Sequence, residues 1–165
     1  MASTLTASTL TVKITESITL NGSAQGSENT LSIGSIKQVQ KRIVSCPANS
    51  ETTVVHFKQV VGAATKFDGA LDVQDVKYVR LTNLDNSNSL TLSLQVEVGE
   101  DDSGADTSAS LLVEPGKSFI IGSPHDGIGV SDANANLVTD LVDLDSLVVQ
   151  PGGNAIDVEV FVAST

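Results

Sequence analysis

Residues 76–98, VKYVRLTNLDNSNSLTLSLQVEV, decide the fold. From residue 90 onward, apolar and polar residues alternate strictly, which is the two-residue period of a half-buried strand. Residues 76–82 are shorter and rich in the residues that strands favour. The Asn, Asp and Ser side chains of residues 83–89 can bond their own backbone and support a turn. The stretch therefore predicts an antiparallel hairpin. Its core-facing residues would be Leu90, Leu92, Leu94, Val96 and Val98.

The same pattern of strands and turn signals continues on both sides. We expect further strands over residues 10–20, 33–46, 52–61, 108–114, 117–121, 146–150 and 156–162. Glu16 interrupts the first series, which predicts a bulge or a short hairpin there. Two segments stay open between strand and helix. Residues 33–46 space their apolar residues three and four apart but are rich in Ile and Val, and residues 137–145 carry a similar spacing.

About eight strands without a convincing long helix predict an all-β fold. An antiparallel β-sandwich of the jelly-roll type, with its first and last strands paired, fits this number. Residues 10–165 would form a single domain. Residues 1–9 are rich in Ser and Thr and would form a flexible N-terminal arm. Pro115-Gly116 fits the central positions of a type II turn between two of the strands.

Composition narrows the classes of function. The chain has one cysteine, Cys46, so it forms no internal disulfide and no cysteine-based zinc site. No run of about 18 apolar residues is present, and residues 1–15 lack the basic and apolar regions of a secretory signal. We therefore expect synthesis in a reducing cytoplasm and no membrane span.

The charge is unevenly distributed along the chain. Residues 1–98 hold eight Lys or Arg and eight Asp or Glu, whereas residues 99–165 hold one lysine and twelve acids. The second part therefore accounts for the whole net charge of −11. A nucleic-acid partner requires a basic surface, and an anionic membrane would repel this one. With no Trp and one Tyr, the chain also has few rings for stacking on sugars or bases.

Two patterns resemble catalytic or nucleotide-binding motifs only in part. Gly116-Lys117-Ser118 ends like a phosphate-binding loop, but Leu111 stands where the first glycine belongs and a strand is expected to follow. His125 and Asp126, with Ser123 nearby, could act in a hydrolase. Neighbours in one loop rarely supply the geometry of a catalytic triad, so we expect no enzyme.

Two groups of oxygen ligands could bind calcium, namely Asp101, Asp102 and Asp106, and Asn83, Asp85 and Asn88. Neither has the spacing of a calcium loop, so solvated turns are the better interpretation. His56 is expected on a solvated or interface face of its strand, and Cys46 as a small buried residue. The sequence thus predicts no catalytic residue, no cofactor and no metal ligand.

Tyr78-Val-Arg80-Leu-Thr82-Asn83-Leu-Asp85, the alternating strand, the acidic loop and the Glu114-Pro115-Gly116-Lys117 turn together resemble small virion proteins of tailed bacteriophages, notably marine phages infecting cyanobacteria and related hosts. The resemblance covers residues 10–163 through short motifs. It implies a β-sandwich structural protein without an active site, assembled in many copies in the host cytoplasm and located in the virion.

The resemblance leaves the place in the particle open. The first hypothesis is a capsid decoration, or cement, subunit that binds and stabilises the shell of major capsid protein. The alternative is a tail or fibre protein, with host-surface binding as one role, and the remote alternative is the hydrolase using His125 and Asp126. The partner would be the major capsid protein or another virion protein. A homo-oligomer, with a trimer favoured by analogy, is expected in either case.

Overall fold

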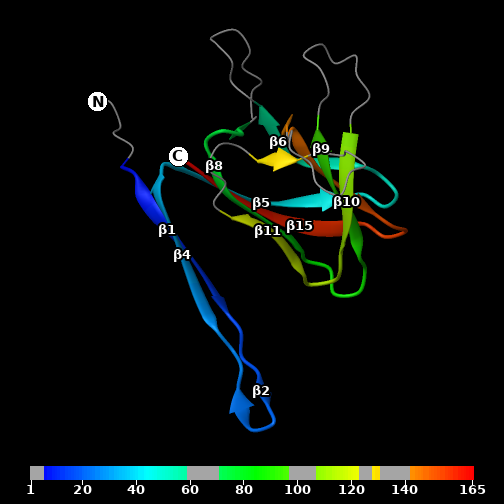
Figure 1. Ribbon diagram of the computed structural model, residues 1–165. Helices are drawn as coiled ribbons and strands as arrows, with labels where there is room; N and C mark the ends of the chain where they lie inside the picture. The colour runs from blue at the N-terminus through cyan, green and yellow to red at the C-terminus, as the bar shows by residue number, and fades with distance from the viewer. Residues whose placement is uncertain (1–5, 59–70, 97–106, 123–127, 131–141) are drawn as a thin grey trace.

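The computed structural model describes residues 6–58, 71–96, 107–122, 128–130 and 142–165. Within these residues the chain consists of strands and connections, without a helix, so the prediction of an all-β fold is confirmed. Figure 1 shows a body of two sheets and a long two-stranded ribbon that leaves it.

The body contains a four-stranded and a five-stranded sheet. The four-stranded sheet has the order β11 (Ser118–Gly122), β8 (Val76–Asn83), β15 (Ile156–Ser164) and β5 (Gln38–Cys46). The five-stranded sheet has the order β10 (Thr107–Val113), β9 (Leu90–Val96), β14 (Ser146–Pro151), β6 (Thr52–Lys58) and β7 (Leu71–Asp72). Neighbours are antiparallel except β7, which pairs parallel to β6. Two further strands, β12 (Gly129–Val130) and β13 (Val142–Asp143), pair with each other.

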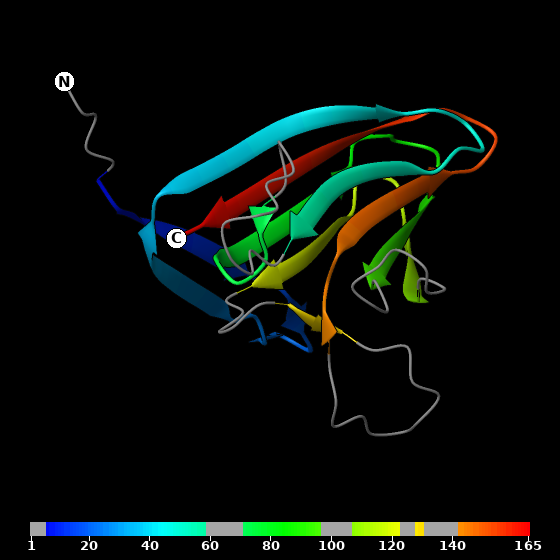
Figure 2. The same ribbon diagram turned by 90° about the horizontal axis from the view of Figure 1, so that it is seen from above.

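Eight of these strands have the order of a jelly roll. The two-residue strands are left out here, and β5 is counted as the first of the eight. The sheet of β5, β15, β8 and β11 then has the order first, eighth, third and sixth. The sheet of β6, β14, β9 and β10 has the order second, seventh, fourth and fifth. This arrangement combines two Greek keys. The last strand, β15, pairs with β5 from Ile156↔Cys46 to Ser164↔Gln38. The pairing of first and last strands is thus found for the strands of the roll, whereas the first predicted strand, residues 10–20, pairs with β4 (Glu28–Ile36) instead. Figure 2 shows β5 and β15 running side by side.

The predicted hairpin over residues 76–98 is wrong. β8 pairs with β11 and β15, whereas β9 pairs with β10 and β14, so the two strands lie in different sheets. Residues 83–89 cross between the sheets, which pack about 10 Å apart, and seven residues suffice for that distance. The alternating pattern identifies the buried face of each strand but not its neighbour. The connection from β10 to β11 also crosses between the sheets. There Gly116 has φ 68° and the Lys117 N–H donates to the Glu114 carbonyl (3.1 Å), as the predicted type II turn requires.

The core lies between the two sheets. Leu90, Leu92 and Val96 are buried as predicted, Leu94 is partly buried against the same cluster, and residue 98 lies outside the described residues. The facing sheet contributes Leu81, Val158, Val160 and Val162 to the cluster. Both sheets therefore bury one continuous apolar layer.

The ribbon precedes the roll. It consists of β1 (Ser8–Thr15) and β4 (Glu28–Ile36), which pair antiparallel, and its tip of β2 (Thr19–Leu20) and β3 (Ser23–Ala24). The break predicted at Glu16 is found, since β1 ends one residue earlier. Asn21 and Gly22 both have positive φ, as a tight hairpin turn requires.

Residues 33–46 form two strands that meet at Lys37, and not a helix. Ser8 pairs with Ile36 but Leu10 with Ile33, so β4 carries one extra residue, and Ser35 there has φ 62°. In a regular strand Ile33 and Ile36 would face opposite sides. The bulge turns both toward the body, which explains why these two residues are spaced three apart. Val39 and Ile43, spaced four apart, lie on the same side of β5, as residues of a regular strand do. Of the other ambiguous segment, residues 142–145 contain β13 and no helix, and residues 137–141 lie outside the described residues.

Candidate functional site

Most of the residues considered for catalysis or calcium binding lie outside the described residues. These are Ser123, His125, Asp126, Asp101, Asp102 and Asp106. The hydrolase hypothesis therefore stays untested. Gly116 lies in a tight turn and Lys117 leads into β11, so the strand expected after the Gly-Lys-Ser motif is present and a phosphate-binding helix is not. Among the described residues, no three His, Cys, Asp or Glu side chains gather in a way that could hold a metal ion.

The connection of residues 83–89 is held by its own polar side chains. The Asp85 carboxylate accepts hydrogen bonds from the backbone N–H of Ser87 (2.7 Å), from that of Asn88 (2.7 Å) and from the Asn88 side chain (3.2 Å). The first two lower the pKa of Asp85. Because one carboxylate oxygen takes all three donors, this geometry is that of a turn, as the sequence indicates.

His56 and Cys46 both lie where the sequence places them. His56 is exposed, and its Nε2 lies 3.5 Å from a carboxylate oxygen of Asp145. Cys46 is fully buried, and this burial raises the pKa of its thiol. Neither residue belongs to a cluster of reactive groups within the described part of the chain.

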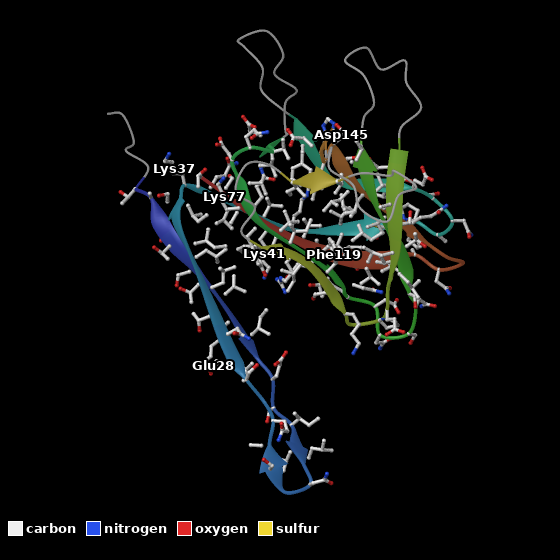
Figure 3. All side chains as sticks on the ribbon, in the orientation of Figure 1. Glu28, Lys37, Lys41, Lys77, Phe119 and Asp145 are labelled. Carbon is white, nitrogen blue, oxygen red and sulfur yellow. The ribbon has the colours of Figure 1, made fainter. Side chains whose placement is uncertain are left out.

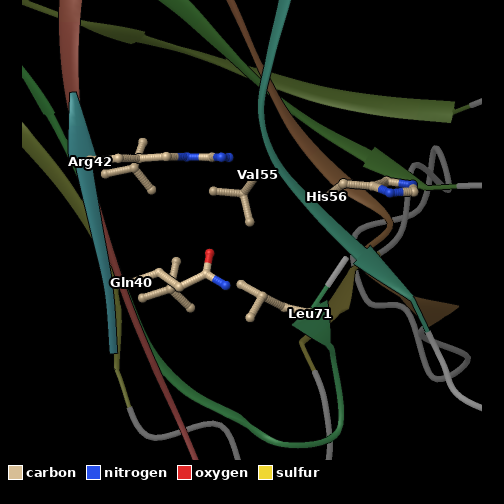
Figure 4. A pocket seen from close by; sticks show the side chains of 7 residues that line it. Gln40, Arg42, Val55, His56 and Leu71 are labelled. Carbon is tan, nitrogen blue, oxygen red and sulfur yellow. The ribbon is translucent and has the colours of Figure 1, made fainter. Parts of the chain in front are cut away.

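Two of the better-formed hollows lie in the described part of the body. The first has a volume of about 10 Å³ and lies between β5 and β6, where Gln40 and Arg42 point toward Val55 and Leu71 (Figure 4). It has room for about one water molecule. The second, of about 270 Å³, is a shallow hollow beside the turn from β10 to β11, lined by Leu111, Leu112, Val113, Glu114, Lys117, Ser118 and Phe119. Both are smaller than the 300–1,000 Å³ that is usual for a ligand pocket.

The base of the ribbon packs on the outer face of the four-stranded sheet. Ile33 and Ile36 are buried there against Tyr78 and Ala163, and Leu10, Val12 and Phe161 complete this cluster. One extra residue in β8, between the pairs Ala163↔Tyr78 and Ser164↔Val76, turns Tyr78 outward, away from the core that Val76 enters. The rings of Tyr78 and Phe161 meet edge to face, with centroids 5.8 Å apart. The body therefore holds the ribbon by one satellite core.

Beyond this base the ribbon is amphipathic and unsupported by the body (Figure 1). On one face Ile14 is 49% exposed, and at the tip Ile18 and Leu20 are 57% and 59% exposed. We call these three residues the distal patch. The opposite face is polar and carries the ion pair between Lys13 and Glu28 (2.8 Å), and Figure 3 shows Glu28 well out along the ribbon. An isolated two-stranded ribbon is marginally stable in water.

A second apolar area remains on the outer face of the four-stranded sheet. Val39, Ile43 and Ile120 point outward and are 52%, 63% and 42% exposed; we call them the sheet patch. Between them the Glu159 carboxylate binds the Lys41 ammonium (3.0 Å) and the Arg80 guanidinium (2.5 Å). The base of the ribbon and the sheet patch thus share one face of one sheet.

The sequence does not identify these surfaces. Alternation over residues 10–14 places the apolar residues on one side of a strand, but it does not distinguish a side that faces the chain's own core from one that faces solvent. The bulge at Ser35 gives the only local signal, since Gly34-Ser35 interrupts an otherwise β-rich run.

The fold and its surfaces define a class: an all-β jelly roll with a projecting ribbon. Comparison of the chain with models of protein families, with curated proteins and with solved structures finds no match. No helix in the described part of the chain is long and apolar enough to cross a membrane.

Proposed function

We propose that the chain is a non-enzymatic structural subunit of a tailed-bacteriophage virion, and specifically a capsid decoration subunit that binds and stabilises the shell of major capsid protein. The observation that carries the assembly role in this proposal is the ribbon, whose distal patch of three large apolar side chains extends beyond the body that would otherwise bury it. Exposed apolar surface of this kind marks a contact with another protein.

Three further observations support an assembly role. The jelly roll is a rigid platform, with strand pairs continuous across both sheets. Two of the better-formed hollows in the described part are smaller than a usual ligand pocket. The acidic second part of the chain disfavours nucleic acid and favours a basic protein surface. The resemblance of the sequence to small virion proteins supports a phage particle as the assembly to which the chain belongs.

Co-sedimentation with empty shells tests the proposal. The purified chain, mixed with shells that lack it, is expected to pellet with them at one stoichiometry and to protect them against heating. Raising the salt concentration should weaken an attraction between the acidic chain and a basic shell surface. A chain that stays in the supernatant at all salt concentrations would refute the decoration role.

Microscopy of intact particles separates the shell from the tail. Density for a jelly roll with a ribbon, repeated over the shell lattice in hundreds of copies, is the expected result. The same density on the tail or fibres, in a few to dozens of copies, would support the alternative of a tail or fibre protein.

A further inference from the structure

The distal patch of the ribbon is exposed on its own chain, and the position of the ribbon limits which surface can cover it. The base of the ribbon already lies on the outer face of its own four-stranded sheet. Leu31 lies at the edge of that face, because an added Cβ on Gly122 of β11 would meet its side chain at 3.4 Å. From this edge the ribbon continues away from the body, so its distal patch does not cover the sheet patch of the same chain (Figure 1).

We propose that the distal patch of one copy docks on the sheet patch of a second copy, so that two copies exchange their ribbons. The interface would continue the contact that the base of the ribbon makes within each chain. In both contacts, aliphatic side chains of the ribbon meet the outer face of the same sheet. This inference goes beyond the proposed decoration role. It names a second copy as the protein that the distal patch contacts, which leaves shell binding to the other surfaces of the body, and its test needs no capsid shell.

The dimensions of the two surfaces agree. The four strands from β11 to β5 span about 14 Å across the sheet, since neighbouring strands lie about 4.8 Å apart. Residues 13–18 of the ribbon, at about 3.3 Å per residue, extend about 20 Å. The distal part of one ribbon is therefore long enough to cross the whole outer face of its partner and reach Val39 and Ile43 on β5.

The charges also agree. Residues 13–31 of the ribbon carry Lys13, Glu16 and Glu28, which gives a net charge of −1. On the outer face of the sheet, Lys41 and Arg80 bind the carboxylate of Glu159, which leaves this group of three side chains with a net charge of +1. A slightly acidic ribbon thus approaches a slightly basic surface, which favours this contact over one between two ribbons or between two sheet faces.

A reciprocal exchange uses more of each copy than a single docked ribbon does. Standard interfaces use about 20–30 residues on each side. Residues 13–31 are 19 residues, just below this range, but in a reciprocal exchange each copy contributes both its ribbon and its sheet face. One ribbon docked alone would make a weaker contact.

Paired variants test the inference in pure protein, without shells. Analytical ultracentrifugation at concentrations on the order of 100 μM should show the wild-type chain as a dimer or a closed higher oligomer. Ile18→Ser with Leu20→Ser removes apolar groups from the ribbon, and Val39→Ser with Ile43→Ser removes them from the sheet. Each pair is expected to raise the dissociation constant at least roughly tenfold, as loss of central interface residues does. Leu112→Ser on β10 is the control, because Leu112 is 64% exposed on the other sheet. It should leave association unchanged.

Mixing the two double variants distinguishes this contact from others. The ribbon variant retains an intact sheet patch and the sheet variant an intact ribbon, so together they can restore one complete contact. The mixture should associate more tightly than either variant alone. A monomeric wild-type chain, dimers that survive either double variant, or a mixture without recovery would each overturn the inference. Shell binding is measured separately, so that a wild-type monomer that still decorates shells would refute the exchange alone.

Discussion

Asn83 is a fully buried polar side chain at the point where the chain leaves one sheet for the other. Its Nδ2 donates to the carbonyls of Asn88 (2.9 Å), Val113 (3.2 Å) and Glu114 (3.3 Å), and its Oδ1 accepts from the Asp85 N–H (3.0 Å). One side chain therefore fixes both connections that cross between the sheets. Buried polar side chains in folded proteins are almost always hydrogen-bonded, as Asn83 is here.

Replacing Asn83 should destabilise the fold without changing a surface. We expect Asn83→Ala to lower the free energy of unfolding by about 1–3 kcal/mol, because the three carbonyls lose their donor inside the protein. Urea denaturation measures the change. Asn86→Ala, at an exposed position of the same connection, should shift it by less than about 0.5 kcal/mol. Equal effects from both variants would contradict the role of Asn83.

Glu159 connects stability to pH on the outer face. The hydrogen bond from Lys41, with the charge of Arg80, lowers the pKa of Glu159 below its usual value. A carboxylate with a lowered pKa stabilises the folded state above its unfolded pKa, and this contribution is lost as the pH falls through the folded pKa.

The Glu159→Gln variant tests this linkage. It should be less stable than the wild type at pH 7, and the difference in free energy of unfolding should shrink as the pH falls below about 4. Urea titrations at a series of pH values provide the measurement. Glu28→Gln is the matched control, since its ion pair with Lys13 is exposed and should contribute little at either pH. A difference that stays constant down to pH 3 would exclude the ion pair as its cause.

At the scale of elements, the ribbon and the central strands differ in how many neighbouring strands they pair with. β15 pairs along its length with both β5 and β8, whereas β1 and β4 pair only with each other. Amide hydrogens exchange when the structure around them opens, and the free energy of this opening is larger for strands that pair on both sides.

The rates of hydrogen exchange should therefore differ between the ribbon and the central strands. In monomeric protein, amides of residues 13–31 are expected to exchange quickly and those of β15 to exchange close to the rate of global unfolding. If the exchanged dimer forms, residues 13–31 should become slower as the protein concentration rises. Protection of the ribbon equal to that of β15 in dilute monomer would contradict this expectation.

The elements also show what the sequence could and could not predict. Most strands of the roll were predicted within a few residues, because alternation reports directly which side of a strand is buried. The pairing of β8 with β9 was predicted wrongly, because a connection rich in Asn and Ser suits both a hairpin and a crossing between sheets. The surfaces of the candidate site were missed altogether. Exposure of Ile18 and Leu20 depends on where the ribbon points, and a bulge at Ser35 with a corner at Lys37 sets that direction.

At the scale of the whole molecule, the roll is complete without the ribbon. Its first and last strands, β5 and β15, already pair, and none of the eight strands of the roll pairs with β1 or β4. The ribbon contributes instead a cover for Tyr78 and Ala163. The prediction that residues 10–165 form a single domain is not tested by these observations.

A chain that starts at residue 37 should therefore still fold. We expect the strand-rich circular dichroism of the full chain and a single cooperative urea transition. Its midpoint should be lower, because Tyr78 and Phe161 lose the apolar cover of Ile33 and Ile36. Loss of the cooperative transition would show that the ribbon is part of the folding unit. The truncated chain should also be a monomer, since it lacks the distal patch.

The corner at Lys37 has a mechanical consequence. The N–H of Lys37 donates to the Ser164 carbonyl (2.9 Å), and β5 begins at the next residue. A force applied to the tip of the ribbon is therefore transmitted directly to β5, because only Lys37 lies between β4 and β5. Where that force runs along β5, the whole ladder between β5 and β15 bears the load in shear, and its bonds must break together rather than one by one. A subunit tethered by its ribbon would thus transfer tension into the ladder between β5 and β15, the longest strand pairing in the described part of its body.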